Sequence, residues 1–211
     1  MQHALKTPNS TANPIARAAS SHSRIPSYRA ILSVGQGDCM VISDPTAALK
    51  TILGSCISAC IYDPRANIGG MNHFLLPTQG SNSDSASWRY GCFAMESLIN
   101  QVLLRGCGKR EYLEVKIFGG GNIQSGTGSI GHDNAAFVES FLSREGLTVV
   151  KKNLRGFQAR QVLFHPTSGR AFMKYSKSDV SALAQKEMVD AKKAVEIKTD
   201  QYASEDDIEL F

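Results

Sequence analysis

The sequence predicts a mixed α/β domain of the α+β kind, with mixed β-sheets and flanking helices. Three observations support this fold class. Short segments with the alternating polarity of strands dominate residues 29–76 and 147–175. Two stretches between them, at about 90–104 and 134–145, carry apolar residues at helical spacing. Strand and helix patterns alternate too irregularly for a doubly wound parallel sheet.

The elements follow in chain order. Residues 1–28 contain no acidic residue and are rich in Ser, Ala, Pro and Asn, which predicts a flexible N-terminal extension. Asp133 and Gly106 are the expected N-cap of the second helix and the end of the first. The predicted strands cover 29–34, 39–42, 49–53, 57–62, 71–76, 113–118, 147–154, 161–165 and 170–175. A helix at 179–195 and an acidic tail are expected within the C-terminal segment 177–211, which leaves 29–176 as the folded domain.

Composition narrows the class of protein. The chain has 211 residues, which suits one domain with extensions, and its five cysteines, without a signal peptide, favour a reducing cytoplasm. No apolar run approaches the roughly 18 residues of a membrane span, so membrane insertion is not expected. Net charge is +4, although residues 178–211 hold four Lys and nine acidic residues. No Lys/Arg run with interleaved aromatic residues indicates nucleic-acid binding.

The stretch 51–77 contains a candidate nucleophile and base. The turn signal at 63–66 predicts a hairpin, because Pro64 presets the backbone for the second turn position. A turn centred between Pro64 and Arg65 places Cys56 directly opposite His73, where an imidazole could take the thiol proton and activate the sulfur for attack on an amide or ester. From the spacing alone, a small buried cysteine and a structural strand histidine are the favoured interpretation. Gly69–Gly70 could host a bulge that changes the register.

Other ligand classes receive less support. A zinc site at Cys56, Cys60 and His73 lacks a fourth ligand. Cys56 and Cys60 on one strand would lie about 13 Å apart, too far for a disulfide. The glycine-rich loop at 119–121 follows a strand but lacks the Gly-Lys-Ser/Thr of a phosphate loop, so close backbone packing is the favoured interpretation. No metal or cofactor is expected.

A set of characteristic segments follows in one order along the chain: Leu53–Cys56, Cys60–Pro64, Ile68–Pro77, Tyr90-Gly91 with Met95-Glu96, Lys116–Asn122, Ile130-Gly131 with Asn134, and Phe164 with Thr167–Arg170. Taken together, these segments resemble the CheD family of chemoreceptor glutamine deamidases. The resemblance covers roughly residues 29–176 and implies a CheD-like cysteine hydrolase fold. It also implies an amidohydrolase that converts particular glutamines of methyl-accepting chemotaxis receptors to glutamate and releases ammonia. The loop 155–160 departs from the family because it lacks the usual doubled glycine.

By the same resemblance, Cys56 is the nucleophile, His73 its base, and Thr51 the third member that orients the imidazole. The backbone N–H groups around Cys56 are candidates for stabilising the oxyanion. Four residues expected near Cys56 and His73 are further candidates for contacting the substrate or the oxyanion. They are Ser55, Asn72, Gly120 and Asn122.

The implied partners are the cytoplasmic domains of chemotaxis receptors and a CheC-like phosphatase, and the implied location is the cytoplasm, beside receptor arrays. The alternative is a non-catalytic interaction module that binds a receptor or a CheC-like phosphatase. A zinc-binding or redox-active thiol protein is a third hypothesis, which predicts bound metal or a Cys56–Cys60 disulfide.

Overall fold

The computed structural model describes residues 27–76, 83–123 and 130–176. Its four-stranded sheet has the order β1 (Ala30–Ser33), β3 (Ala47–Leu53), β8 (Arg160–His165) and β9 (Arg170–Tyr175). Its five-stranded sheet has the order β2 (Cys39–Ile42), β5 (Ile68–Asn72), β4 (Ile57–Asp63), β6 (Glu114–Gly119) and β7 (Thr148–Leu154). The helices are α1 (Ser83–Arg105), α2 (Ile130–Arg144) and the short 3-10 helix η1 (Arg110–Tyr112).

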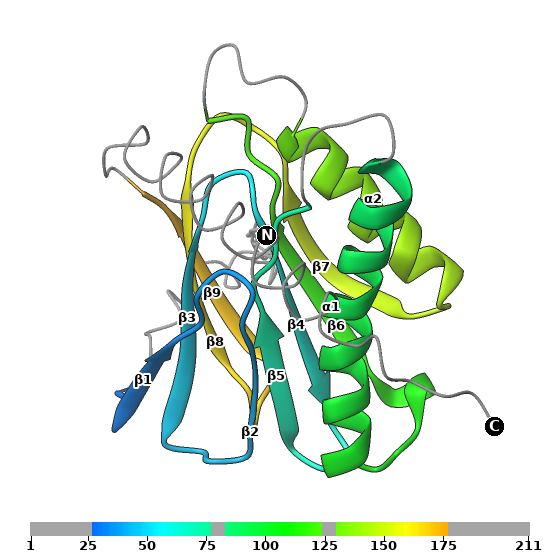
Figure 1. Ribbon diagram of the computed structural model, residues 1–211. Coiled ribbons are helices and arrows are strands. Elements are labelled where there is room, and N and C mark those ends of the chain that lie inside the picture. The colour runs from blue at the N-terminus through cyan, green and yellow to red at the C-terminus, as the bar shows by residue number, and fades with distance from the viewer. Residues whose placement is uncertain (1–26, 77–82, 124–129, 177–211) are drawn as a thin grey trace, which may run out of the picture.

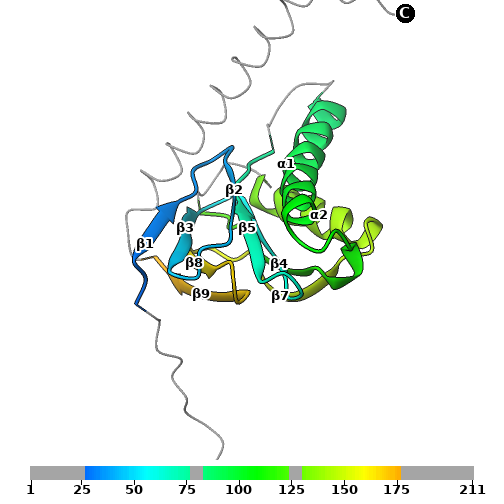
Figure 2. The same cartoon turned by 90° about the horizontal axis from the view of Figure 1, so that it is seen from below.

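These elements form three layers, with the five-stranded sheet in the middle (Figure 1). Figure 2 shows α1 and α2 together on the side of that sheet that faces away from β8 and β9. The pairs β1–β3 and β6–β7 are parallel, whereas the other strand pairs are antiparallel. The predicted fold class, mixed sheets with flanking helices, is therefore confirmed.

Strand β4 is buried along its whole length because both faces of its sheet are covered. Ile57, Ala59 and Ile61 pack in the core that α1 and α2 share with this sheet. Cys60 and Tyr62 alternate with them and belong to the second core, between the two sheets. Burial of a Leu or Ile side chain stabilises a fold by about 1.5–3 kcal/mol, so the two cores hold the three layers together. The candidate site lies in the core between the sheets.

The two described α-helices, α1 and α2, both start earlier than predicted. Helix α1 begins at Ser83, because the polar residues before the apolar stripe continue the helix without showing its period. Helix α2 begins at Ile130, so Asp133 lies in its first turn and is not its N-cap. A carboxylate is favourable in either position, since both lie close to the positive end of the helix dipole.

The hairpin between β4 and β5 differs from the prediction in its connection. Asp63 and Ile68 form the last pair, so the four residues 64–67 form the loop. Asp63 Oδ1 accepts two backbone N–H groups of this loop, at 2.9 and 3.2 Å. Asn67 has a φ of 52°, a left-handed conformation that asparagine tolerates and that closes the longer loop.

The longer loop shifts the pairing by two residues, so the prediction that Cys56 lies directly opposite His73 is wrong. Beyond the end of β5, Ile57 bridges Phe74, with backbone N···O distances of 2.8 and 2.9 Å. An even shift keeps each side chain on its own face of the sheet. Cys56 and His73 therefore still project to the same side, toward the four-stranded sheet.

Gly69 and Gly70 do not form a bulge, because they pair in register with Tyr62 and Ile61. A Cβ at Gly70 would lie 2.6 Å from the Met40 carbonyl oxygen, and one at Gly69 would lie 2.6 Å from that of Ile61. These glycines permit close packing of neighbouring strands.

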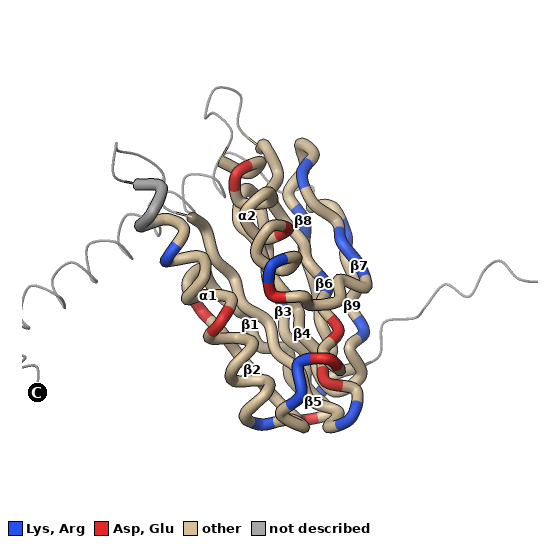
Figure 3. Tube along the Cα trace, turned by 90° about the vertical axis from the view of Figure 1, so that its right-hand side faces the viewer, with Lys and Arg blue, Asp and Glu red and all other residues tan. Residues whose placement is uncertain are grey.

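The outer edge of the five-stranded sheet is basic. Figure 3 shows Lys and Arg residues along β7, whose Lys151 and Lys152 are exposed. Lys152 Nζ and Arg155 Nη2 lie 2.8 and 2.7 Å from the Glu139 carboxylate on α2. Charged side chains on an edge strand discourage pairing with another chain.

Three predicted segments lie outside the described residues: the N-terminal extension, the helix at 179–195 and the acidic tail. Of the extension, only residues 27 and 28 are described. Among the described residues, neither long helix has the length and apolar character needed to cross a membrane.

Candidate active site

Thr51 and His73 are hydrogen-bonded across the space between the two sheets. Thr51 Oγ1 lies 2.9 Å from His73 Nδ1 and donates to the Val34 carbonyl oxygen at 2.8 Å. His73 Nδ1 also lies 3.3 Å from that carbonyl. The Val34 carbonyl can only accept, so all three groups are satisfied when Thr51 donates to Val34 and Nδ1–H donates to Thr51 Oγ1. Nε2 is then the basic nitrogen of the neutral imidazole.

The strands bring these three groups together. Thr51 lies on the inward face of β3 and is buried. Val34 directly follows β1, which runs parallel to β3 and pairs Ser33 with Lys50, so Val34 is the neighbour of Thr51. His73 directly follows β5 and is also buried. The pair between Thr51 and His73 thus depends on how the two sheets pack.

Cys56 lies in the connection between β3 and β4, and its side chain is 0% exposed. Its backbone carbonyl accepts the N–H of Gly120 at 2.8 Å, and its Sγ lies 3.5 Å from Gln36 Oε1. Gly119 has a φ of +119°, and a Cβ there would lie 1.9 Å from the Cys56 carbonyl oxygen. Only glycine fits this close approach, which explains part of the glycine-rich loop at 119–121.

Cys56 and His73 occupy diagonal positions on one face of the sheet, one residue before the Ile57–Phe74 bridge on each strand. Side chains in diagonal positions of an antiparallel pair have Cβ atoms about 7–8 Å apart at most, within reach of a ring. The imidazole can therefore approach the thiol from this register.

A tight turn, Gly35–Asp38, holds the backbone of His73 on both sides. Gly37 N–H donates to the His73 carbonyl at 2.7 Å, and His73 N–H donates to the Asp38 carbonyl at 3.1 Å. The turn is closed by Asp38 N–H to the Gly35 carbonyl at 3.1 Å, and by Gly35 N–H to Asp38 Oδ2 at 3.0 Å. This places Gln36, at the tip of the turn, beside the thiol.

Asn134 on α2 fixes the loop that contains Cys56. Its Nδ2 donates to the Ser55 carbonyl at 3.1 Å, and its Oδ1 accepts the N–H of Leu76 at 2.8 Å. Asn134 is fully buried, whereas its partners Ser55 and Leu76 are half-buried. The bonds join the segments on either side of the site to one helix.

The predicted oxyanion contacts are only partly brought together. Asn72 Oδ1 accepts the Ala59 N–H at 2.8 Å, and its Nδ2 donates to the Ala94 carbonyl at 2.9 Å, so its amide lies on the helix face of the sheet, away from Cys56. The Gly120 N–H is bonded to the Cys56 carbonyl. The N–H of Asn122 donates to the Gly156 carbonyl at 2.7 Å. Asn72 and the Gly120 N–H therefore have other hydrogen-bond partners in this structure, whereas Ser55 directly precedes Cys56.

The remaining cysteines differ from Cys56 in their surroundings. All five cysteines are free in this structure. Burial raises the pKa of the Cys60 thiol to about 12, so it stays protonated and unreactive at neutral pH. Cys107 is exposed. Within the described ranges, no group of three His, Cys, Asp or Glu side chains has the arrangement of a metal site.

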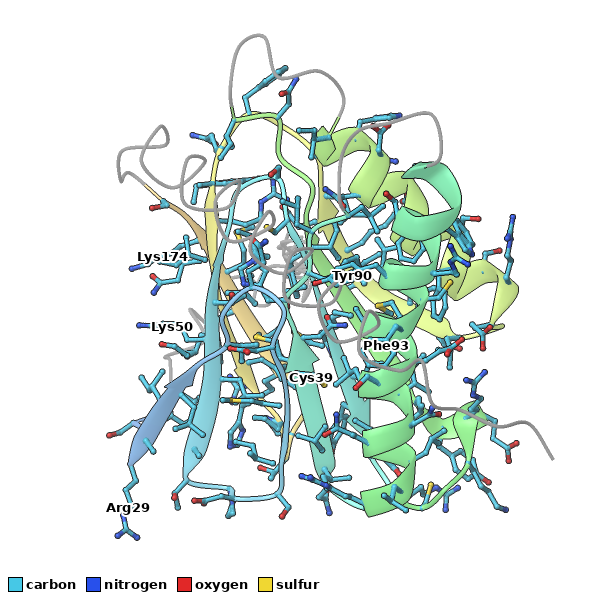
Figure 4. The ribbon with its side chains drawn as sticks, viewed as in Figure 1. Arg29, Cys39, Lys50, Tyr90, Phe93 and Lys174 are labelled. Atoms are coloured by element: carbon cyan, nitrogen blue, oxygen red, sulfur yellow. The ribbon has the colours of Figure 1, made fainter. Side chains whose placement is uncertain are left out.

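Tyr90 directs its side chain from α1 toward the sheets, as Figure 4 shows. Burial, and secondarily the negative charge of a Cys56 thiolate, raise the pKa of the Tyr90 hydroxyl above its ordinary value. The hydroxyl therefore stays protonated beside the site and remains a hydrogen-bond donor.

Sequence reasoning missed the roles of Val34 and Gln36 in building the site. Residues 35–38 lie between two predicted strands and contain two glycines, which mark a turn, but nothing in them indicates what the turn touches. Tyr90 and Asn134 were singled out only through family resemblance, without a contact being assigned to them.

The family model and the curated relatives indicate the same family. Residues 75–175 match the family model described as CheD chemotactic sensory transduction. A probable chemoreceptor glutamine deamidase CheD of Rhodopseudomonas palustris is 49% identical over 154 residues, which cover 71% of this chain and 72% of the relative. The corresponding Caulobacter vibrioides protein is 51% identical over 138 residues, 65% of this chain and 73% of the relative.

Among solved structures, a Neisseria meningitidis protein of family DUF152 aligns with a TM-score of 0.38 and 11% identity, over 60% of this chain and 64% of that one. The family-model match begins two residues after His73. The family-model match therefore does not include Thr51, Cys56 or His73.

Proposed function

Because the chain belongs to the CheD family, we propose that it hydrolyses the side-chain amide of specific glutamines in chemotaxis receptors, with Cys56 as nucleophile, His73 as base and Thr51 as the residue that orients the imidazole. The observation that carries the proposal is the Thr51–His73 hydrogen bond. It leaves Nε2 as the basic nitrogen on a ring that faces the same side of the sheet as the thiol.

The chemistry proceeds in two halves. His73 Nε2 takes the Cys56 proton, and the thiolate attacks the carboxamide carbon of the substrate glutamine. The resulting oxyanion collapses, the carbon–nitrogen bond breaks, and the imidazolium gives its proton to the departing ammonia. Water, deprotonated by His73, then attacks the thioester, which releases glutamate and restores the thiol. Every atom comes from substrate, water and protein, and the scheme uses no metal or cofactor.

Ser55 is retained in this scheme as an oxyanion candidate, together with the backbone N–H groups of Ser55 and Cys56. Asn134 supports their position because it anchors the Ser55 carbonyl. Asn122 remains a candidate for substrate contact because it is exposed beside the glycine-rich loop.

The substrates in this proposal are the cytoplasmic domains of methyl-accepting receptors, and the enzyme acts in the cytoplasm beside receptor arrays. A CheC-like phosphatase is a further proposed partner. The same thioester route would accept a methyl ester of glutamate, since attack, collapse and hydrolysis are unchanged when methanol replaces ammonia as leaving group.

Intact-mass analysis of a receptor cytoplasmic fragment tests the proposal. Conversion of one amide to a carboxylate adds about 1 Da, and we expect this change with the wild-type protein but not with Cys56→Ala. Cys107→Ala is the matched control, because it removes an exposed cysteine outside the site. A fragment that binds the wild-type protein without gaining mass would instead indicate the non-catalytic interaction module.

A further inference from the structure

Gln36 is the side-chain amide that the structure brings to the candidate nucleophile. Its Oε1 lies 3.5 Å from Cys56 Sγ, close enough to accept the weak hydrogen bond of a thiol. The side chain is half-buried, at the tip of the Gly35–Asp38 turn. It belongs to neither the Thr51–His73 pair nor the glycine-rich loop.

Attack by a thiolate on a carboxamide creates a negative oxygen, and a donor must meet it. Removal of one such donor typically lowers kcat by about 10²–10³-fold. Two of the groups expected to serve are engaged elsewhere. Both ends of the Asn72 amide are bonded on the helix face of the sheet, and the Gly120 N–H is bonded to the Cys56 carbonyl.

The position of Gln36 suits this task. In the tetrahedral adduct the oxyanion sits on the carbon bonded to Sγ, so an amide that touches Sγ can come within the required 2.7–3.1 Å or so of that oxygen. The resting thiol has a proton to donate, and Oε1 accepts it. After the proton has moved to His73, the Nε2 group of the same planar amide is the complementary donor. Rotation about the terminal χ3 torsion, which is soft, exchanges the two ends.

The turn also makes Gln36 a preorganised group. Gly37 and Asp38 are bonded to the carbonyl and N–H of His73, at 2.7 and 3.1 Å. The backbone that carries the amide is thus tied to the residue that carries the base. Only the χ3 rotation is then needed as charge develops, because the backbone that carries the amide is already in place, and such preorganisation favours stabilisation.

We propose that Gln36 is a catalytic residue whose side-chain amide stabilises the oxyanion formed at Cys56. The inference rests on the proposed deamidase function. It assigns to the turn a part in the chemistry as well as in holding His73.

Steady-state kinetics of receptor-fragment deamidation test the assignment with two variants. Gln36→Met keeps the length of the side chain but has no N–H, and we expect kcat to fall about 10²–10³-fold with KM changed less than about threefold. Gln36→Glu is isosteric and presents negative charge to the oxyanion, so kcat should fall at least as far. Gln161→Met, on the outer face of β8, is the matched control and should keep the wild-type kcat. Thermal unfolding of each variant shows whether it is folded.

Three results would overturn the assignment. Unchanged kcat in Gln36→Met means that the amide does not act in the chemistry. Faster turnover means that Gln36 instead obstructs the substrate, and a change confined to KM means that it only binds substrate. If any of these occurs while Cys56→Ala is inactive, the proposed function stands and the role of Gln36 falls. If the wild-type protein itself adds no mass to receptor, both fall.

Discussion

Replacing Thr51 by valine tests the orientation of the base. Valine keeps the β-branched shape and removes the hydroxyl. The Val34 carbonyl loses its 2.8 Å donor, and His73 Nδ1–H keeps only that carbonyl, at 3.3 Å. A buried polar group left unsatisfied costs about 1–3 kcal/mol. Because the Val34 oxygen retains Nδ1–H as a second donor, we expect the free energy of unfolding to fall by about 1 kcal/mol, at the low end of that range.

Thr51→Val should also slow turnover, because the lost bond is stronger in the transition state than in the resting enzyme. In the transition state His73 becomes an imidazolium, and its bond to Thr51 Oγ1 becomes a hydrogen bond from a charged donor. Such bonds contribute about 1.5–3 kcal/mol. The neutral bond in the resting state already contributes about 0.5–1.5 kcal/mol, so the transition state loses about 1–1.5 kcal/mol more than the ground state. At 1.36 kcal/mol per factor of ten, kcat should fall roughly 5- to 13-fold.

Ammonia release from a saturating receptor fragment measures this change in Thr51→Val. Thr51→Ser is the matched control, because it keeps the hydroxyl and loses only a methyl group, and its kcat should stay within about threefold of wild type. The reasoning fails if the folded valine variant turns over at the wild-type rate. It also fails if serine lowers kcat as much as valine does.

Three further outcomes are expected. Gly119→Ala should lower the free energy of unfolding by more than about 3 kcal/mol in urea denaturation, because its Cβ would lie 1.9 Å from the Cys56 carbonyl oxygen. Gly146→Ala is the control, since Gly146 has a φ of +64° but open space around it, and should cost about 1 kcal/mol. The raised pKa of Cys60 makes the free energy of unfolding depend on pH. This contribution is complete below about pH 8.5, where the unfolded thiol is also protonated, and the free energy then falls by up to about 1.4 kcal/mol per pH unit until about pH 12. Urea titrations with reductant should show that Cys60→Ala removes this slope. Peptide mapping after brief iodoacetamide treatment at pH 7 should show that His73→Ala slows alkylation of Cys56 by about tenfold or more but leaves exposed Cys107 unchanged; equal rates at Cys56 would refute activation by the imidazole.

Most of the fold could be predicted from the sequence because its strands show a clear alternation of apolar and polar residues. β4 alternates between two cores, and the alternation of Ile57, Ala59 and Ile61 with polar or small residues marks it directly. Helix α1 shows where periodicity runs out, since residues 83–87 continue the helix without an apolar stripe. Such a segment is helical because the turns after it are packed, and no local pattern records that.

The candidate site was readable only in part, and the hairpin shows why. Whether Cys56 and His73 face the same side of the sheet depends only on whether the register shift is even or odd, and the alternating pattern of the strands predicts that well. Their separation along the strands depends on the length of the hairpin loop. That length was decided by Asn67 in a left-handed conformation and by two bonds to Asp63, contacts that a turn signal at Pro64 does not reveal. The contact between Gln36 and the Cys56 thiol was harder to predict, because it joins a turn and a loop that are 20 residues apart in the sequence.

The division of the site between the two sheets has a consequence for how activity depends on packing. Thr51 and the Val34 carbonyl belong to the four-stranded side, whereas His73 and Cys56 belong to the five-stranded side. The turn 35–38 crosses between them and carries Gln36. A substitution that lets the sheets separate by a few tenths of an ångström would lengthen the Thr51–His73 bond without touching either residue. Because hydrogen bonds weaken steeply with poor geometry while a core accommodates small shifts at modest cost, turnover should be lost before stability when this interface is loosened.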